Sequence, residues 1–415
     1  MRVTAAFSSL LRLDGVHVRD VVFEADRVIV LVALRRRRLI CPCCSFSTPH
    51  RHDIRPVDSD WRHLDLGVWR LEIRARLRRL VCPEHGVRTE QVPFARYRSD
   101  FTRDFEHLAA WLATRTDKTT ITRMLRIHWR TVGRIIQRVC ADELDPDRLD
   151  DLFEIGIDEV SWRKGHRYLT LVADHHRRQI VWGAEGASAT VADSFYEQLG
   201  PERCAQIEAV SMDMGPGYAK STRANAPQAI VCIDSFHVAK LGGDALDEVR
   251  RDYWNELRLM GDQDVAKRFK DARWALLKRP ENLTDRQTQT LRALKAAGGK
   301  VARGYELKEA LRSIFAPGLS VDDVAELLAR FCSRASRSRM PSFIRLGKTI
   351  RRHRDGILAA VRLGITNARA EALNNKVRLI TRRAYGFHSA DAALALVMLT
   401  CGPITLQPPH ELHLH

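Results

Sequence analysis

The sequence lacks any apolar run that approaches the roughly 20 residues needed to span a bilayer. The apolar stretches 28–34 and 392–399 match a short strand and about two helical turns. The start of the chain also lacks a signal-peptide core, because Arg12 interrupts its apolar stretch. We therefore expect no membrane span and a protein that stays in the cytoplasm.

Acidic residues are also in short supply. The 415-residue chain has 51 Asp plus Glu against 68 Lys plus Arg, which gives a formal net charge of +17. This deficit favours a polyanionic partner, with nucleic acid as the first candidate and an acidic membrane surface as the second. Internal repeats and low-complexity segments are absent, and the 45% hydrophobic content is typical of a folded chain. Because the length exceeds one ordinary hydrophobic core, we expect several domains.

The nine cysteines do not form the pattern of a disulfide framework. Five are isolated, whereas Cys41, Cys43, Cys44 and Cys82 lie near one another in the sequence. The pairs Cys41–Cys44 and Cys82–His85 each have a two-residue gap, which lets each pair occupy adjacent corners of a tetrahedral Zn²⁺ site. We predict a structural zinc held by these four residues.

Other ligand sets remain open from the sequence. Cys43 is an extra thiol that could replace one ligand, and His50 or His52 could compete with His85. A set of cytosolic thiols without metal is the remaining alternative. A closed four-ligand site has no open position, so the predicted zinc serves to fold a small basic domain.

The pattern of residues 1–100 predicts a β-rich domain, with strands at 28–33 and 69–77. The second strand alternates strictly between two faces. Its apolar face carries Leu71, Ile73, Ala75 and Leu77. Its basic face carries Arg70, Arg74, Arg76 and Arg78. Each arginine alone fits a solvated surface, but combined with the next segment they favour a DNA-binding front end.

The apolar pattern changes to a helical period after residue 101. Helices are expected at 105–112, 120–125 and 132–139, with a tight polar link before the last one. This arrangement predicts a helix-turn-helix, although any small helical bundle shows similar spacing. The recognition helix would then carry Trp129, Arg130 and Arg134.

Beyond an acidic linker, 142–151, strand candidates are followed by alternating helices and strands. The strands are expected at 153–162, 166–173, 179–184, 207–213 and 228–233. Helices are expected at 190–199, after Gly217 and after the last strand. An antiparallel hairpin pair that leads into βα units is the strand order of the ribonuclease H fold.

A long helical stretch, 240–360, interrupts this order and predicts an inserted helical domain. Capping-box sequences begin helices at Thr284 and Ser320. We expect Trp254 and Trp274 to anchor the core of this domain, rather than to stack on a flipped base.

Three acidic residues are positioned to share a metal site. Asp158 ends the first core strand and Asp213 closes the fourth, which is its neighbour in a ribonuclease H sheet. Glu371, on the polar face of a final helix at 367–383, would complete the set. Carboxylates that converge in this way bind two Mg²⁺ or Mn²⁺ ions for phosphodiester chemistry. Each acid alone fits a solvated strand end or a helix cap, so the prediction rests on their combination.

A second constellation follows the fifth strand, where Asp234 and His237 are separated by two residues. One interpretation sets both side chains beside the metal pocket, with His237 orienting a carboxylate, water or phosphate. The alternative is an Asp N-cap with a chance histidine one turn later.

From near its start to residue 400, the chain resembles the bacterial insertion-sequence transposases of the ISL3 family. The motifs are CPCC with CPEH, GIDEVSW, SMDMGPGY, CIDSFHVAK, RWALLKRPENLT and NARAEALNNKVRLITRRAYGF. The resemblance implies a zinc-binding segment, a helix-turn-helix and a ribonuclease H-like DDE core with a helical insertion. The family's catalytic triad corresponds to Asp158, Asp213 and Glu371, and its Asp-x-x-His signature to Asp234 and His237. The extra Cys43 departs from the family pattern, so the zinc ligands are less firmly implied than the triad.

We therefore expect a multidomain α+β transposase that binds the terminal inverted repeats of an insertion sequence and catalyses metal-dependent strand cleavage and strand transfer. The alternatives are a catalytically silent DNA-binding regulator derived from a transposase and a structure-selective nuclease of the same fold. The expected domains are a zinc-binding β-rich DNA-binding domain (1–100), a helix-turn-helix with linker (101–150), the first part of the ribonuclease H-like core (151–240), an all-helical insertion (241–360), the final core helices (361–402) and a C-terminal tail (403–415).

The expected partner is double-stranded DNA, both the transposon ends and the target. The DNA contacts expected on the final helix are Lys376, Arg378 and Arg382. Because two ends must be held together, we expect a homodimer or a higher oligomer on DNA, associated with the nucleoid in the bacterial cytoplasm.

Overall fold

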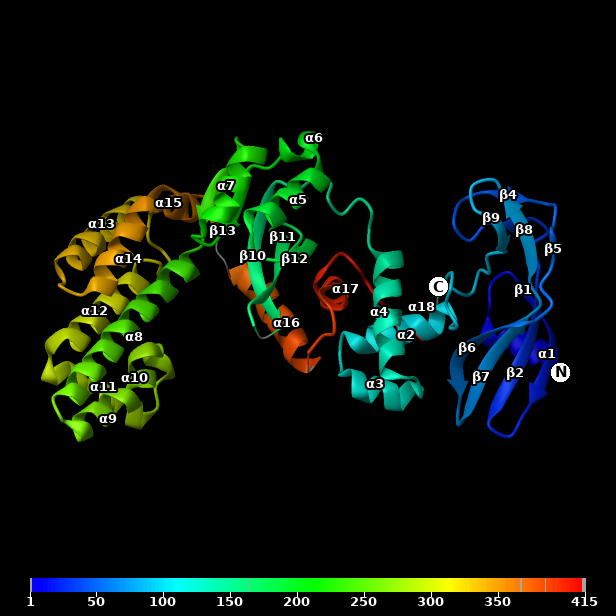
Figure 1. Cartoon of the computed structure of the whole chain (residues 1–415), viewed down its shortest axis with the longest axis horizontal. Helices are drawn as coiled ribbons and strands as arrows, with labels where there is room; N and C mark the ends of the chain where they lie inside the picture. The colour runs from blue at the N-terminus through cyan, green and yellow to red at the C-terminus, as the bar shows by residue number, and fades with distance from the viewer. Residues whose placement is uncertain (1, 164, 366–367, 385, 413–415) are drawn as a thin grey trace. The chain divides into compact units, whose positions relative to one another are not determined.

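The computed structural model describes residues 2–163, 165–365, 368–384 and 386–412. Within helices, a few side chains lie outside the described part, including those of Glu371 and Asn374. The chain divides into two compact units, Met1–Asp145 with Leu379–His415, and Pro146–Arg378 (Figure 1). Among the described residues, no helix is both long and apolar enough to cross a membrane.

The first unit contains a sheet with the order β1-β2-β7-β6 in the described residues. Its strands are β1 (Val16–Phe23), β2 (Arg27–Leu34), β6 (Ser59–Leu66) and β7 (Trp69–Ala75). Helix α1 (Val3–Leu11) packs against β1. The predicted alternation of β7 is confirmed, since Leu71, Ile73 and Ala75 are buried in the core under the sheet.

The strand predicted at 69–77 is two residues too long. β7 ends at Ala75, and the chain passes buried Leu77 into a different sheet. Ala75 and Leu77 are both buried, so the alternation of apolar residues continues across the change of sheet and does not reveal it. Arg78 therefore belongs to a different sheet from Arg74. The strands of this second sheet are β5 (Asp53–Ile54), β8 (Arg78–Cys82) and β9 (Gly86–Thr89).

The three helices predicted after residue 101 are confirmed. They are α2 (Arg103–Ala113), α3 (Lys118–Leu125) and α4 (Trp129–Glu143). Side chains of Thr102 and Asp117 cap α2 and α3 by accepting hydrogen bonds from backbone amides three residues later. The apolar face of α4 is buried against α2 and α3.

The C-terminal residues complete this helical cluster. α17 (Ala390–Cys401) packs against α4, and α18 (Pro409–Leu412) lies against α2. Arg383 donates hydrogen bonds to the carbonyls of Thr114 and Arg115, just beyond α2. Thus α17, expected among the final core helices, contacts the helix-turn-helix.

A buried ionic cluster joins the helix-turn-helix to the segment before it. Glu106 on α2 is fully buried and accepts hydrogen bonds from Arg96 at 3.1 Å and Arg138 at 2.6 Å. Arg96 is also buried and contacts Asp142 and Glu143 at the end of α4. The charges of Glu106 and Arg96 are therefore satisfied within the unit, which fixes α2 against α4.

The sheet of the second unit has the order β12-β11-β10-β13-β14 among the described residues. The strands are β10 (Glu154–Arg163), β11 (Arg167–Asp174), β12 (Gln179–Glu185), β13 (Ala209–Met212) and β14 (Ile230–Ile233). β10, β11 and β12 are antiparallel, whereas β13 runs parallel to both β10 and β14. The predicted adjacency of the first and fourth core strands is confirmed. The helices among these strands are α5 (Ala189–Leu199), α6 (Pro201–Cys204) and α7 (Pro216–Asn225).

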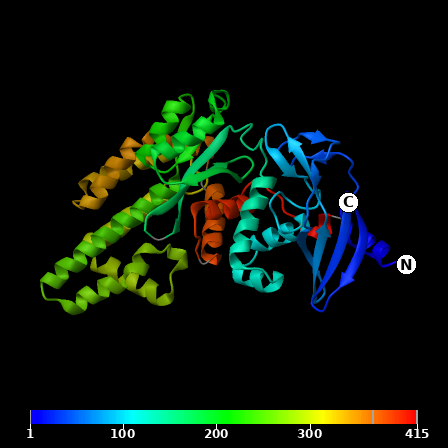
Figure 2. The same ribbon diagram turned by 45° about the vertical axis from the view of Figure 1, so that its right-hand side comes forward.

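A helical insertion begins directly after β14. α8 (Ser235–Leu259) leaves the sheet and reaches α9 at its far end (Figure 2). Both predicted capping boxes are formed, at Thr284 and at Ser320. The later helices are α9 (Gln263–Asp271), α10 (Arg273–Leu277), α11 (Asp285–Ala297), α12 (Gly299–Ser313), α13 (Val321–Arg337), α14 (Pro341–Arg352) and α15 (Arg354–Leu363). α15 returns to the sheet and packs against β14, and α16 (Ala368–Arg383) follows it.

The predicted burial of two tryptophans in the insertion is wrong for Trp274. This side chain is 55% exposed, and the Arg273 guanidinium lies 5.2 Å from its ring centroid. The reason is local, because the short α10 turns Ala275 and Leu276 into the core instead. Trp254 on α8 is partly buried, with Arg258 over its ring.

Candidate active site and metal centre

Asp158 and Asp213 lie near the point where the pairing of two neighbouring strands ends. The pairing of β10 with β13 ends with Gly156 opposite Ser211. Each aspartate follows the last paired residue by two positions, and both line the same hollow. Neighbouring strands lie about 4.8 Å apart, so two carboxylates at this edge can share cations about 4 Å apart.

The expectation that Asp158 ends its strand is wrong. β10 continues to Arg163 and pairs with β11 along this length, with Asp158 opposite Leu171. What ends near Asp158 is the pairing with β13, because the chain turns into α7 after Asp213. The hairpin with β11 thus continues past Asp158, whereas the pairing of β10 with β13 ends at Gly156 and Ser211.

The turn after β13 holds the Asp213 carboxylate. The amide of Gly215 donates a hydrogen bond to Asp213 Oδ1 at 2.8 Å. A Cβ at position 215 would lie 2.8 Å from the same oxygen, so a side chain there would displace the carboxylate. Pro216 then begins α7. The Gly-Pro sequence therefore explains both the end of the strand and the orientation of Asp213.

The structure confirms Asp234 as a helix N-cap and also brings its carboxylate into contact with His237. Asp234 is the N-cap of α8 and accepts a hydrogen bond from the amide of Phe236 at 2.9 Å. Its other carboxylate oxygen lies 2.6 Å from His237 Nδ1. This hydrogen bond raises the pKa of His237, burial opposes the rise, and the charges of Asp158 and Asp213 add to it. The imidazole therefore responds to the negative charge of the whole site.

Four of the predicted catalytic residues line one hollow. These are Asp158, Asp213, Asp234 and His237. Leu373 of α16 lines the same hollow. Glu371 lies in this helix two residues before Leu373, but its side chain is outside the described part of the structure.

A support beneath the two aspartates was not predicted. Buried His175 contacts Ser211 Oγ through its Nε2 at 2.7 Å. A Cβ at Gly156 would lie only 3.0 Å from His175 Nε2 and 3.1 Å from Ser211 Oγ. Gly156 and Ser211 each stand two residues before an aspartate, so this contact sets the spacing of the strands there. A glycine inside a strand is the signal that could have indicated it.

Glu159 and Tyr218 were also missed by the sequence analysis. The Tyr218 hydroxyl lies 3.0 Å from Thr170 Oγ1 and donates a hydrogen bond to Glu159 Oε2 at 3.5 Å. Burial and the charges of Asp213 and Asp158 raise the pKa of Glu159, while Tyr218 and His237 lower it. The site therefore holds an excess of negative charge, which suits a cation.

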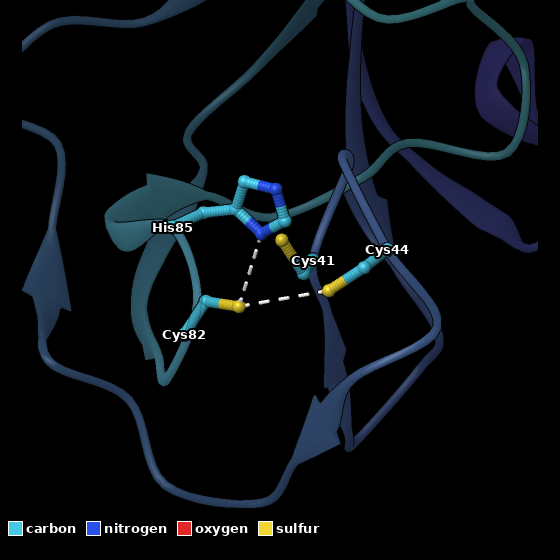
Figure 3. Close-up of side chains that lie close together, drawn as sticks. All are labelled: Cys41, Cys44, Cys82 and His85. Carbon is cyan, nitrogen blue, oxygen red and sulfur yellow. Dashed lines mark hydrogen bonds between the residues drawn. The ribbon is translucent and has the colours of Figure 1, made fainter.

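The predicted zinc ligands converge on one point (Figure 3). The ligand atoms of Cys41, Cys44, Cys82 and His85 all lie within 4.8 Å of one another. Cys44 Sγ is 3.6 Å from Cys82 Sγ, which is 3.5 Å from His85 Nδ1. A tetrahedral zinc with bonds of about 2.3 Å to sulfur needs ligand atoms roughly 3.5–3.8 Å apart. The cluster therefore fits a closed four-ligand zinc site.

The alternative zinc ligands lie elsewhere. Cys43, His50 and His52 are exposed and do not belong to this cluster of described residues. The cluster sits on its own small core, in which Leu39 and Leu80 are buried. Short strands β3 (Leu39–Ile40) and β4 (Ser47–Thr48) flank the first cysteine pair. The folded geometry thus selects one of the ligand sets that the sequence left open.

The arginine face of the first unit is largely neutralised by its own carboxylates. The ion pairs are Arg74–Asp60, Arg76–Asp58 and Arg78–Glu90. The first pair follows from strand register, since Asp60 on β6 is directly opposite Arg74 on β7. Arg70, the second residue of β7, lies opposite Arg27 of β2.

The remaining predicted DNA contacts are exposed. Trp129, Arg130 and Arg134 lie along the first turns of α4. Lys118 Nζ of α3 sits 4.3 Å from the Trp129 ring centroid, and burial lowers the pKa of this lysine. The exposed cations on α16 are Lys376, Arg378 and Arg382.

Comparison with known proteins agrees with these features. A family model described as the ISL3 transposase matches residues 155–396, and a model for the helix-turn-helix domain of transposase family ISL3 matches residues 90–140. The transposase for insertion sequence element IS1557 from two strains of Mycobacterium tuberculosis is 38% identical, over 96% of each chain. The transposase for insertion sequence element IS1001 from Bordetella parapertussis is 28% identical, over 85% of this chain and 86% of its own. The chain therefore belongs to the ISL3 family of insertion-sequence transposases, with a DNA-binding helix-turn-helix and a DDE transposase domain.

Proposed function

We propose that Asp158, Asp213 and Glu371 are the catalytic carboxylates of this transposase and bind two divalent cations, Mg²⁺ or Mn²⁺. The observation that carries the proposal is that Asp158 and Asp213 each follow the last paired residues of β10 and β13 by two positions and line one hollow. The hollow that both residues line, and its excess of negative charge, support cation binding.

Bound cations would polarise the scissile phosphate and activate the attacking water or 3′-hydroxyl. Asp234 holds Nδ1 of His237, which leaves Nε2 available toward the hollow. We assign His237 to donating a hydrogen bond to a phosphate oxygen or water, because its neighbours favour the protonated ring. Asp234 is then the residue that orients it.

The strand order supports a ribonuclease H-like core. An antiparallel segment, β12-β11-β10, continues into the parallel strands β13 and β14, and the helical insertion lies between β14 and α16. The domain boundaries expected from the sequence remain our proposal, with α17 assigned to the helix-turn-helix because it packs on α4.

We further propose that the helix-turn-helix recognises the terminal inverted repeats. Exposed Trp129, Arg130 and Arg134 on α4 are the contacts nearest a recognition role. The exposed cations of α16 would assist, whereas the paired Arg74, with its neighbours on the arginine face, would contribute less. A homodimer or higher oligomer on DNA would hold two ends, and a single protomer that cleaves and joins both ends in a sized complex would contradict it.

The cluster of Cys41, Cys44, Cys82 and His85 is proposed to bind one structural Zn²⁺. Its role is to fold the small core around Leu39 and Leu80, because all four positions of the site are occupied by protein. Metal analysis of the purified protein tests this, with one zinc per chain expected and its loss expected in Cys82→Ser.

The central experiment is cleavage of labelled DNA that carries the element's own ends, with Mg²⁺ or Mn²⁺. The variants are Asp158→Asn, Asp213→Asn and Glu371→Gln, and the matched control is Glu202→Gln, an exposed carboxylate on α6 of the same unit. We expect nicking at the end junction by wild type and control, a loss of more than about 1000-fold in each triad variant, and unchanged DNA binding.

Two outcomes would contradict the proposal. Specific binding of the ends by wild type without cleavage under any metal condition would favour a silent regulator. Cleavage that depends on the three carboxylates but ignores the terminal repeats would favour a structure-selective nuclease.

A further inference from the structure

Three arginines gather around a groove in the helical insertion, far along the chain from the helix-turn-helix. Arg303 comes from α12, and Arg334 and Arg337 come from successive turns of α13. The groove encloses about 630 Å³ and is floored by the buried side chains of Leu307 and Met340. Three guanidinium groups therefore surround one depression with an apolar floor.

These arginines are not neutralised by the protein. Among the described residues, no carboxylate forms an ion pair with Arg303, Arg334 or Arg337. Arg337 instead donates to the hydroxyl of Ser333 on its own helix at 2.9 Å. One acid, Glu306, lines the groove, so the local charge is about +2 with three cations and one anion.

Neighbouring arginines of the same helices behave differently. Arg312 of α12 pairs with Glu309 at 2.8 Å, and Arg330 of α13 pairs with Glu326. Arg345 of α14 pairs with Glu248 at 2.5 Å. Carboxylates thus neutralise some arginines of the insertion, whereas the three at the groove have only Glu306 nearby and form no ion pair with it among the described residues. An external anion would relieve this local repulsion.

Further basic residues lie on the helices that return from the insertion to the sheet. Arg351 and Arg354 line a second hollow against α13. At the corner between α14 and α15, burial and the charges of Arg352 and Arg223 lower the pKa of His353, while Asp213 raises it. α15 then packs on β14, whose end leads to Asp234.

We propose that the groove of Arg303, Arg334 and Arg337 binds the phosphate backbone of double-stranded DNA, as a contact surface separate from the helix-turn-helix. Arginine guanidinium groups bind phosphate oxygens in pairs of hydrogen bonds and remain charged at any working pH. The contact reads no base, so it holds DNA of any sequence near the catalytic edge. This inference rests on the proposed function, since it assigns DNA to the second unit.

The test compares two triple variants of the full-length protein. The groove variant is Arg303→Gln, Arg334→Gln and Arg337→Gln, and the control variant is Arg312→Gln, Arg330→Gln and Arg345→Gln. Both remove three positive charges from the insertion, so long-range electrostatics change equally. Binding of a labelled duplex of random sequence is measured between roughly 50 and 300 mM NaCl, because each phosphate contact contributes about 0.9 to the slope of log K against log salt.

We expect the groove variant to lose about 2 to 3 units of this slope, and the control to lose less than about 0.5. Equal losses in the two variants, or no loss in either, would overturn the inference. Glu306→Gln provides a test of opposite sign, since removal of the single acid should tighten binding. Weaker binding or no change in binding by Glu306→Gln would also contradict the proposed DNA contact at the groove.

Failure of the catalytic proposal has a different signature. If wild type binds duplex DNA but never cleaves it, while the groove variant still loses its slope, the backbone contact stands and the catalytic assignment fails. If wild type cleaves at the ends and the two triple variants bind alike, the catalytic assignment stands and the groove inference fails.

Discussion

Two arginine-rich regions of this transposase differ in whether carboxylates of the protein neutralise their arginines. On the sheet of the first unit, Arg74 and Arg76 are paired with Asp60 and Asp58. In the α12–α13 groove of the second unit, arginines of the same kind have no carboxylate partner among the described residues. The first arrangement stabilises the fold, whereas the second leaves charge available to a ligand. A net charge of +17 therefore does not locate the surface that meets DNA.

Acidic residues show the same contrast. Glu106 of the first unit is enclosed by Arg96 and Arg138, and its charge is satisfied. Asp158 and Asp213 of the second unit stand side by side, and their charges raise the pKa of their neighbour His237. The second unit thus holds several negative charges close together. Such an arrangement is typical of a functional site that binds a ligand of opposite charge.

The largest expected effect tests the internal pairing of the first unit. Glu106→Gln should lower the free energy of unfolding by about 3–5 kcal/mol, because it leaves the buried Arg96 without its central partner. Hydrogen exchange of the amides in α2 and α4 measures the change. The matched control is Glu326→Gln in the second unit, whose partner Arg330 is exposed, so little change is expected. Equal changes in the free energy of unfolding for Glu106→Gln and Glu326→Gln would contradict the stabilising role of the buried ion pairs.

A second variant tests the packing under the catalytic aspartates. Gly156→Ala should slow cleavage about 100-fold, equivalent to about 2.7 kcal/mol, because its Cβ would push against His175 and Ser211. DNA binding should be unchanged, and the rates of end cleavage measure the effect. Gly243→Ala is the control, since a Cβ there meets nothing within 4 Å. Full activity of Gly156→Ala would show that the spacing of β10 and β13 tolerates the methyl group.

The smallest expected effect has the opposite sign to the first. Asp213→Asn should stabilise the protein by about 1 kcal/mol in buffer without Mg²⁺ or Mn²⁺, because it removes one of several adjacent negative charges. The amide keeps an oxygen that can accept the hydrogen bond from Gly215. Thermal unfolding of the second unit measures it. A clear loss of stability would mean that Asp213 is already satisfied by the protein, as Glu106 is.

Four residues that gather at the candidate site could be picked out from the sequence because they depend on local signals. Asp213 stands before Gly215, where the chain must turn, and Asp234 stands at a helix start. Gly156 inside a strand signals that some group approaches the backbone closely there, but the identity of that group, His175, depends on the lateral register of β10 against both β11 and β13. A histidine just after a strand gives no sign of which neighbour it will contact.

The fold could be predicted where an element buries one regular face. It was misread where the packing of neighbouring elements decides which side chains are buried or paired. Alternation in β7 identified its buried face, but Asp60, the acid opposite Arg74, lies on β6 and was not foreseen. Trp274 was misassigned because burial in the short α10 depends on how α8 and α11 pack on it. Large apolar residues are usually buried, and this rule carries no information about a helix of five residues.

The packing of α17 against α4 has a consequence for how the helix-turn-helix is assembled. Nearly all of α17 is buried, and it packs on one face of α4 although the whole second unit lies between the two helices in the sequence. The first unit is therefore built from two separate segments of the chain. Its helix-turn-helix acquires this cover after the second unit has been synthesised, so the two units are linked in the order of translation although each has its own core.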